Sequence, residues 1–247
     1  MDNKKKVIIV TGASSGIGEC TAKHLISCGY TVVATARRED KLLSLFGDNN
    51  EAVIIPWDLS ELDSIDEYSK KVADKCGEIN GLVHCAGISH VSPLYLTKSS
   101  DIQKIFNINT FAAMRLVGAF SKKNKTSKPA SFVLISSMSA HEGVVGSTAY
   151  ASSKAAIEGF VQAAVPELAD REIRINCIAP GVVETEMTAE FQRQLSDEKR
   201  DEILSEYPFG LGKPEDVANL IEYLIDEKSR WITGRTFVMD GGHLSRK

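Results

Sequence analysis

Tyr150 and Lys154 are the two residues of this sequence whose types and spacing best suit acid–base chemistry. In a helical segment, side chains four positions apart lie on the same face. A free tyrosine has a pKa of about 10, and a nearby ammonium group favours the phenolate and lowers that pKa. The pair therefore predicts a general acid or base for alcohol and carbonyl chemistry. The same spacing also occurs in amphipathic helices that merely expose a lysine, so the prediction needs support from elsewhere in the chain.

Two polar residues upstream give that support. Ser137 follows the apolar run Phe132–Ile135, which predicts a strand, so its hydroxyl can reach the crevice at the end of that strand. A hydroxyl held against a carbonyl oxygen stabilises the charge that develops there. Asn109 stands inside a helical pattern. It is either an ordinary exposed position or an interruption of the helix that serves a water or lysine contact.

A glycine-rich turn predicts where a cofactor binds. Thr11–Gly18 joins an apolar strand to a helix with the spacing G-x-x-x-G-x-G. Glycine permits a tight turn and close approach of a diphosphate, and the helix N-terminus offers free N–H groups to that anion. A plain strand-to-helix turn is the alternative, because such glycines alone are a weak signal.

The residues after the second predicted strand indicate which dinucleotide is bound. An acidic residue at this place bonds the ribose 2′-hydroxyl of NAD, whereas arginine accommodates the 2′-phosphate of NADP. Here the chain reads Thr35-Ala36-Arg37-Arg38, with no acid at position 36. Arg37 therefore predicts NADP, since a guanidinium suits phosphate. A solvent-facing arginine at a helix start is the alternative.

The elements that must position these residues alternate along the chain. Apolar runs predict strands at 7–10, 31–35, 52–55, 82–85, 132–135, 173–178 and 236–239, and helical patterns lie at 17–28, 60–76, 101–123, 148–168 and 214–226. Alternating strands and helices indicate an α/β fold, a doubly wound parallel sheet of about seven strands with helices on both faces. We expect one Rossmann-fold domain over 1–247, with a helical insertion at about 184–208 that shapes the substrate site.

Composition excludes several classes of protein. The chain has 247 residues, 43% hydrophobic and 25% charged, with a net charge of −4, so a nucleic-acid partner is not expected. Its five cysteines are scattered and form no C-x-x-C pair, which indicates neither disulfides nor a zinc site and favours a cytoplasmic protein. No apolar run is long enough for a signal peptide or a membrane span. We expect no metal and no membrane association.

Together these motifs resemble the short-chain dehydrogenase/reductase family, in its compact single-domain branch, over nearly the whole chain. The resemblance implies a catalytic tetrad of Asn109, Ser137, Tyr150 and Lys154. Ser137 is preferred to Ser136 and Ser139 because its spacing to Tyr150 is the family's usual one. The residues implied to contact the cofactor are Gly12, Ser14, Ser15, Gly16, Ile17, Gly18, Arg37, Asp58, Leu59, Cys85, Ala86, Gly87, Tyr150, Lys154, Pro180, Gly181, Val183 and Thr185.

The sequence departs from the family pattern at three places. His84-Cys85 stands where the family often has two asparagines, which puts some hydrogen bonds between strands in doubt. Pro166 lies inside the helical pattern that carries Tyr150, where its missing N–H should kink the helix. Glu172 replaces a common glycine before the next strand.

The resemblance implies hydride transfer between NADP and a carbonyl or secondary alcohol. Ser137 would hold the carbonyl oxygen, Tyr150 would protonate it, Lys154 would lower the pKa of Tyr150, and Asn109 would hold a water. A 3-oxoacyl thioester is one candidate substrate, since the chain is similar to 3-oxoacyl-[acyl-carrier-protein] reductases. The alternatives are an alcohol, sugar or steroid dehydrogenase that works oxidatively, and a non-catalytic nucleotide-binding regulator.

The same resemblance implies a homotetramer or homodimer, formed through the helices near 101–123 and 148–168. The basic run Lys122–Lys128 is expected to be a solvated helix end. Docking of an acidic carrier protein is its less favoured interpretation.

Overall fold

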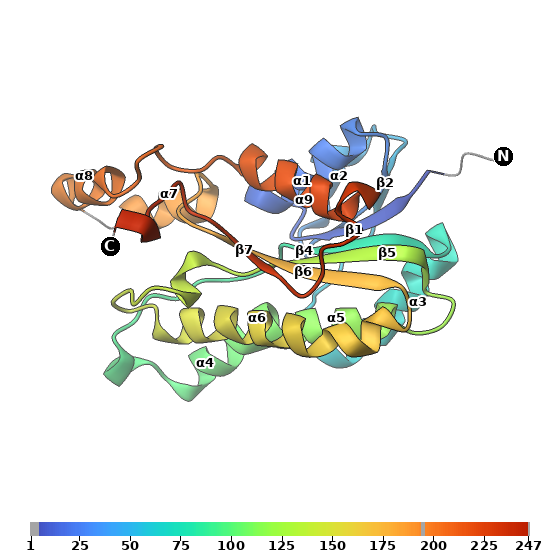
Figure 1. Ribbon diagram of the computed structural model, residues 1–247, viewed down its shortest axis with the longest axis horizontal. Coiled ribbons are helices and arrows are strands. Elements are labelled where there is room, and N and C mark those ends of the chain that lie inside the picture. Colours follow the sequence, from blue (N-terminus) through green and yellow to red (C-terminus); the bar gives the residue numbers. More distant parts are fainter. Residues whose placement is uncertain (1–4, 194–195, 247) are drawn as a thin grey trace.

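The strands form one parallel sheet in the order β3-β2-β1-β4-β5-β6-β7 (Figure 1). The computed structural model describes residues 5–193 and 196–246. Its strands are β1 (Val7–Thr11), β2 (Thr31–Thr35), β3 (Ala52–Ile54), β4 (Ile79–His84), β5 (Thr126–Ile135), β6 (Ile173–Pro180) and β7 (Thr236–Met239). All neighbouring strands run parallel, which confirms the predicted doubly wound α/β fold.

Helices cover both faces of the sheet, because each connection between parallel strands must cross over one face. In Figure 1, α1, α2 and α9 lie above the sheet, and α3, α4, α5 and α6 lie below it. The α-helices are α1 (Gly16–Ser27), α2 (Glu39–Phe46), α3 (Ile65–Cys76), α4 (Ser99–Phe106), α5 (Ala112–Phe120), α6 (Thr148–Ala169), α7 (Glu186–Arg193), α8 (Asp197–Ser205) and α9 (Pro214–Ile225). The 3₁₀ helices are η1 (Leu62–Ser64), η2 (Leu94–Leu96), η4 (Met138–Ala140), η5 (Glu227–Ser229) and η6 (Leu244–Arg246), and η3 (Asn107–Phe111) is a π-helical turn.

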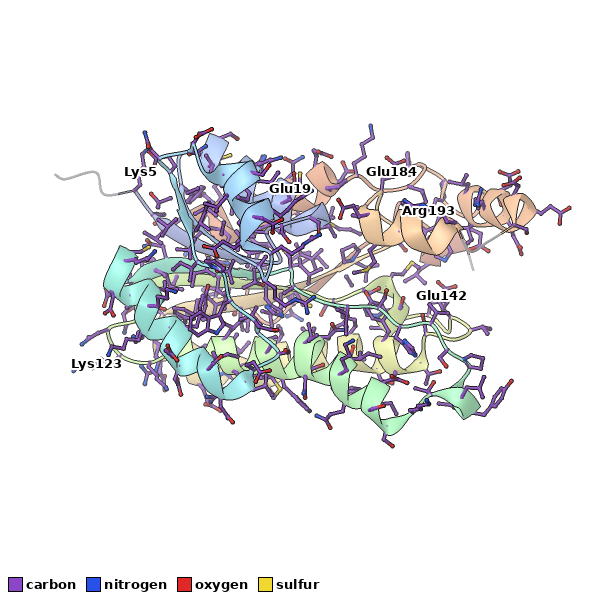
Figure 2. All side chains as sticks on the ribbon, turned by 180° about the vertical axis from the view of Figure 1, so that it is seen from behind. Lys5, Glu19, Lys123, Glu142, Glu184 and Arg193 are labelled. Atoms are coloured by element: carbon purple, nitrogen blue, oxygen red, sulfur yellow. The ribbon has the colours of Figure 1, made fainter. Side chains whose placement is uncertain are left out.

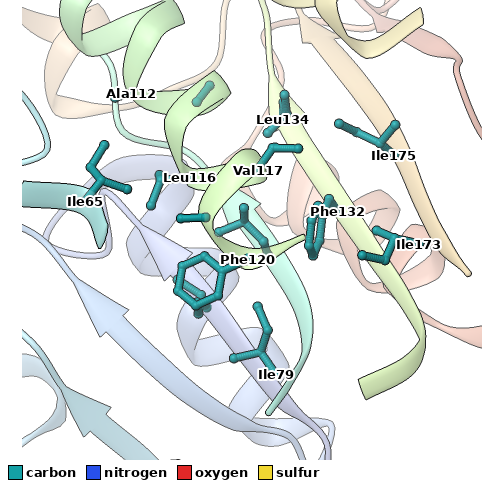
Figure 3. Packing of buried hydrophobic residues seen from close by; sticks show 14 of the residues in the cluster. Ile65, Ile79, Ala112, Leu116, Val117, Phe120, Phe132, Leu134, Ile173 and Ile175 are labelled. Carbon is teal, nitrogen blue, oxygen red and sulfur yellow. The ribbon is translucent and has the colours of Figure 1, made fainter. Parts of the chain in front are cut away.

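The sheet divides the apolar core into two clusters, one under α3, α5 and α6 and the other under α1, α2 and α9. Figure 3 shows the first of them, where Phe132 and Leu134 of β5 face Leu116 and Phe120 of α5. These four side chains are fully buried. Because both faces of the inner strands are covered, their sequences are continuous apolar runs rather than alternating ones.

The strand order places the ends of four strands at one crevice. β1 lies between β2 and β4, so the order of strands reverses at this point in the sheet. Ligands of doubly wound folds bind beyond the carboxyl ends of the strands at such a reversal. β1, β4, β5 and β6 are each followed there by a segment that the sequence singles out for function.

Several predicted elements have different bounds in the structure, and three of these differences are large or move a predicted site residue. The helix expected over 101–123 is divided into α4, the π-helical turn and α5. The strand expected at 82–85 begins at Ile79 and ends at His84, so Cys85 lies in the following loop. β5 begins at Thr126, six residues before the apolar run, because β5 pairs with a strand on each side and its ladder reaches beyond that run.

The early start of β5 corrects the interpretation of the basic run for Lys128 alone, since residues 122–125 lie in the turn that follows α5. α5 ends at Phe120, so Lys128 lies in a strand and not at a helix end. Lys122 pairs with Asp66 at 2.6 Å, and Lys128 pairs with Glu172 at 3.5 Å. Much of the positive charge in this run is therefore balanced within the chain.

Two of the sequence departures lie in and after α6. The helix continues through Pro166 to Ala169, so the proline does not end it. Glu172 has a φ of 56°, a left-handed backbone conformation that glycine adopts freely. A side chain at such a position costs about 1 kcal/mol, and the glycine of the family pattern would avoid that cost.

The segment 184–208 carries two helices, α7 and α8, beyond the carboxyl ends of the strands (Figure 1). This is where the sequence predicts a helical insertion beside the ligand crevice. Within residues 5–193 and 196–246, no helix combines the length and apolar character that a membrane span requires.

Candidate active site

Ser137, Tyr150 and Lys154 meet at the carboxyl end of β5. The Ser137 hydroxyl lies close enough to the Tyr150 phenol to lower its pKa. Ser137 Oγ also lies 3.2 Å from Ser139 Oγ and accepts from the Ser139 N–H at 3.2 Å. Lys154 Nζ lies 5.8 Å from the centre of the Tyr150 ring. α6 therefore presents phenol and ammonium on one face, as their spacing predicts, and Ser137 is the serine that contacts the phenol.

The pKa of Tyr150 is displaced in the direction opposite to our prediction. Burial of the phenol raises its pKa above the ordinary value, and the hydrogen bond from Ser137 opposes this only in part. The expected lowering by Lys154 is wrong for this state of the site, because desolvation of the phenolate dominates and the opposing effect comes from Ser137. At neutral pH the tyrosine consequently holds its proton and can act as an acid.

Lys154 is itself buried, with 4% of its surface exposed. Its Nζ donates to the Ile135 carbonyl oxygen at 2.8 Å. Burial lowers the pKa of Lys154 to about 8, so the group is still mostly protonated at pH 7. A side chain at Gly87 would come within 3.3 Å of Lys154 Nζ, so glycine there lets the loop after β4 reach the lysine.

Asn109 is fully buried at the centre of the π-helical turn. Its Oδ1 accepts from the Ile88 N–H at 2.8 Å, and its Nδ2 donates to the Ile88 carbonyl at 3.0 Å and to Ser153 Oγ at 2.9 Å. Of the two interpretations of Asn109 that the sequence allows, the interruption of the helix is therefore the one that the structure shows. The side chain ties the loop after β4 to α6 rather than pointing to solvent.

His84 is a buried neutral imidazole at the end of β4. Thr11 Oγ1 accepts from the Ala86 N–H at 3.2 Å and lies 2.9 Å from His84 Nδ1. Because a hydroxyl can donate one hydrogen bond and accept two, Thr11 Oγ1 and His84 Nδ1 can share this bond in either tautomer of the imidazole. Nε2 faces the backbone of Ile108 but makes no hydrogen bond of ordinary geometry with the described residues. Burial, and secondarily Lys154, lowers the pKa of His84 to about 3.

Replacing His84 with asparagine is expected to flatten the acid dependence of stability. An unfolded histidine titrates near 6.5 and the folded one near 3, so the unfolded state binds the extra proton between these values. The contribution of neutral His84 to the free energy of unfolding is complete above pH 6.5. It falls as the pH drops, by about 2 kcal/mol at pH 5. Urea unfolding at pH 7.5 and pH 5.0 should show this loss in wild type and not in His84→Asn. Equal losses in both proteins would refute the assignment.

Most of the predicted cofactor residues line one cavity of about 280 Å³. It lies at the reversal of strand order and takes its walls from the ends of β1, β2, β3 and β4. Its predicted members are Gly12, Ser14, Ser15, Gly16, Ile17, Gly18, Arg37, Asp58, Leu59, Cys85, Ala86, Gly87 and Thr185. Burial raises the pKa of the Cys85 thiol to about 12, so Cys85 is a wall residue and not a reactive thiol.

Close packing explains the glycines of the turn. A Cβ on Gly18 would lie 2.4 Å from the Gly12 carbonyl oxygen, and one on Gly12 would lie 2.8 Å from the Ala86 nitrogen. Gly12 also has a φ of 69°. The turn therefore brings bare backbone and the N-terminus of α1 to the cavity, as binding of a diphosphate requires.

Two arginines flank the cavity, although the sequence was interpreted through Arg37 alone. The Arg38 guanidinium bends onto the glycine turn and donates from Nη2 to Ser14 Oγ at 3.0 Å and Ser15 Oγ at 3.3 Å. Arg37 is exposed on the cavity wall beside Asp58. Burial opposes ionisation of Asp58, but hydrogen bonds from Ser60, aided by Arg37, hold its pKa below the ordinary value. The two consecutive arginines at 37 and 38 were the sequence feature that could have predicted a cofactor role for Arg38 as well.

Five predicted cofactor residues lie outside the cavity wall: Tyr150 and Lys154 on α6, and Pro180, Gly181 and Val183 at and after the end of β6. Pro180 ends β6, Gly181 packs against Tyr207 and Asp240, and Val183 is buried beside Gly212. They connect β6 to the segment after α8 and to the C-terminal part of the chain. Of the cofactor residues predicted between 180 and 185, only Thr185 lines the cavity. Among the described residues we find no group of three His, Cys, Asp or Glu side chains suited to a metal ion.

Comparison with known proteins gives consistent matches over the whole chain. A family model described as Enoyl-(Acyl carrier protein) reductase matches residues 12–243. The chain is 35% identical over 245 residues to the 3-oxoacyl-[acyl-carrier-protein] reductase FabG of Thermotoga maritima, which covers 96% of this chain and 97% of that protein.

Solved structures agree with these sequence matches. ElxO with NADP bound matches with a TM-score of 0.87 at 31% identity, over 98% of this chain and 99% of that one, and a tyrosine-to-phenylalanine variant of ElxO with NADPH bound gives the same values. A 4-hydroxyisoleucine dehydrogenase complexed with NADH matches with a TM-score of 0.91 at 28% identity, over 98% of this chain and all of that one.

Proposed function

Because this chain belongs to the short-chain dehydrogenase/reductase family, we propose that it is an NADP(H)-dependent oxidoreductase that interconverts a carbonyl group and a secondary alcohol. The observation that carries this proposal is the contact between Ser137 and Tyr150, with Lys154 beside the phenol ring and against Gly87, a residue of the cavity wall.

The described residues suit a phosphorylated dinucleotide. The glycine turn and the N-terminus of α1 would hold the diphosphate. Arg37 and Arg38 would hold the 2′-phosphate, and Asp58 and Leu59 would border the adenine. The bound nicotinamide supplies or accepts the hydride.

The chain's own residues would handle the proton and the developing charge. The Ser137 hydroxyl orients the carbonyl oxygen, and the phenol of Tyr150 donates its proton to that oxygen. The raised pKa of Tyr150 keeps this proton available at neutral pH. Once the proton has left, the ammonium of Lys154 and the hydroxyl of Ser137 stabilise the phenolate. Asn109 holds the loop after β4 against α6 while this happens.

We propose a 3-oxoacyl thioester as the substrate in the reductive direction. Support comes from the Thermotoga relative and from apolar side chains on the loops beyond the strand ends. Leu94 is 67% exposed, Tyr95 85%, Val145 94% and Phe209 90%. The segment that carries Leu94 and Tyr95 is joined to the segment that carries Val145, because the Ser92 N–H donates to the Gly146 carbonyl at 2.9 Å. Such a rim suits an acyl chain better than a sugar.

A carrier protein would present this thioester by a route other than the basic run. Lys123 of that run lies at the end of the molecule opposite Glu142, which follows the Ser137 segment (Figure 2). The ion pairs of Lys122 and Lys128 also reduce the charge available to an acidic partner.

The proposal also covers the oligomeric state of the protein, its domain organisation and its location in the cell. Exposed Ile102, Phe111 and Met114 on α4 and the following turn and helix suit a homodimer or homotetramer interface. We propose one domain over the whole chain, with 184–208 as its substrate loop. All five cysteines are free, and a cytoplasmic location agrees with that.

A substrate screen tests the proposal. Reduction of 3-oxoacyl thioesters of increasing chain length, a cyclic ketone and a 2-keto acid would be followed by absorbance of the reduced cofactor, with NADPH and NADH in parallel. We expect turnover with NADPH and a kcat/KM that rises roughly fourfold per added methylene, since each buried CH₂ contributes about 0.8 kcal/mol. NADPH binding without turnover of any carbonyl compound would show a non-catalytic nucleotide-binding protein instead.

A further inference from the structure

The segment that carries Ser137 is attached to α6 through one carboxylate, that of Glu158. Glu158 Oε1 accepts a hydrogen bond from Ser136 Oγ at 2.7 Å and lies 3.1 Å from His141 Nε2. Ser136 Oγ also lies 3.1 Å from the Lys154 carbonyl oxygen. The Glu158 side chain is 13% exposed, and Ser136 is 3% exposed.

These contacts hold both ends of a short segment. Ser136 comes directly before Ser137, and His141 follows the 3₁₀ helix η4, whose N-terminal residue is capped by Ser137. Both ends therefore meet the same oxygen of the same side chain. Tyr150, Lys154 and Glu158 follow one another at intervals of four on α6, so they share roughly one face. The face that presents the phenol also holds the serine segment.

We infer that Glu158 is a positioning residue, whose carboxylate holds the 136–141 segment against α6 and so sets the contact between Ser137 and Tyr150. This inference rests on the proposed roles of Ser137 and Tyr150. Hydrogen bonds to a carboxylate are shorter and stronger than neutral ones, and a partly buried carboxylate with two donors is well suited to fix a loop. Nothing in the proposed chemistry requires Glu158 to touch substrate or cofactor.

Glu158→Ala and Glu158→Gln separate positioning from other roles. Glutamine keeps an oxygen that can accept from Ser136 and His141, whereas alanine removes it. We expect kcat to fall about 10- to 100-fold in Glu158→Ala, because small misplacement of reacting groups costs this much, with KM for NADPH unchanged. In Glu158→Gln, kcat should stay within about threefold of wild type, because weakening these hydrogen bonds costs no more than the loss of one weak hydrogen bond. Glu167→Ala, an exposed glutamate of the same helix, is the matched control and should behave as wild type.

A measurement without turnover keeps this test separate from that of the proposed function. The Tyr150 13Cζ resonance, assigned by its absence in Tyr150→Phe, reports the hydrogen bond from Ser137. It should move in Glu158→Ala and stay in place in Glu158→Gln and Glu167→Ala, whether or not a substrate is known. His141→Ala removes one donor from an exposed position and serves if Glu158→Ala does not fold; it should shift the resonance in the same direction by less.

Two results would overturn the inference. An unmoved Tyr150 resonance in Glu158→Ala and His141→Ala would show that the carboxylate does not set the contact. A loss in Glu158→Gln as large as in Glu158→Ala would show that the negative charge, not the hydrogen-bonded position, matters. If wild type turns over no carbonyl compound but the resonance behaves as expected, the proposed function fails and the positioning role stands.

Discussion

Tyr150→Phe is expected to lower kcat for carbonyl reduction by about 10²- to 10⁴-fold, the usual contribution of a positioned general acid. Phenylalanine keeps the ring and its packing but has no proton to give. NADPH affinity should change by less than about tenfold, because a neutral hydrogen bond contributes about 0.5–1.5 kcal/mol.

The raised pKa of Tyr150 also predicts different pH dependences for carbonyl reduction and alcohol oxidation. A buried phenol that stays protonated is ready for reduction at neutral pH, whereas alcohol oxidation needs the phenolate. Wild-type oxidation should therefore accelerate as pH rises above neutrality, and reduction should not. In Tyr150→Phe both residual rates should lose this dependence.

Single-turnover kinetics and NADPH fluorescence titration measure the two quantities separately. Tyr223→Phe is a suitable control, because Tyr223 is 40% exposed on α9, on the face of the sheet opposite α6. It should match wild type in both measurements. Turnover by Tyr150→Phe at the wild-type rate, with NADPH fully bound, would remove Tyr150 from the proposed chemistry.

Much of the fold follows from local sequence patterns. The run Val7–Val10 ahead of Gly12 and the spacing of apolar residues in α6 are local signals, and short apolar runs separated by helical periods have few arrangements besides a parallel sheet. The ends of elements were less predictable. The π-helical turn at Asn109 depends on Ile88 and Ser153, which lie 21 and 44 residues away and which no local pattern connects to it.

The site divides in the same way. Ser137 and Tyr150 lie at a strand end and on a helix face, so pattern and topology together bring them close. The direction of the Tyr150 pKa shift could not be obtained from spacing, because it depends on how completely the site is buried. Glu158 was missed for a similar reason. Its partners are defined by side-chain directions at the end of β5, and a glutamate on a helix is ordinarily a solvated residue.

Removing both arginines beside the glycine turn is the second large effect that we expect. In Arg37→Ala/Arg38→Ala, KM for NADPH should rise about 10²- to 10³-fold, since each charge-assisted hydrogen bond to phosphate contributes about 1.5–3 kcal/mol and solvent screens part of it. KM for NADH should rise less than about tenfold, because NADH has no 2′-phosphate to lose. The wild-type preference for NADPH would then be largely abolished.

The single variants should differ in their effects on the two cofactors, because only Arg38 is hydrogen-bonded to the glycine turn. Arg38 donates to Ser14 and Ser15, so Arg38→Ala loosens the turn and should weaken both cofactors. Arg37 is exposed beside Asp58, so Arg37→Ala should weaken NADPH alone. Lys41→Ala, in the first turn of α2 and outside the cavity wall, is the control for loss of a positive charge. A wild-type enzyme that uses NADH faster than NADPH, or a double variant with unchanged KM for NADPH, would exclude a phosphate site at these arginines.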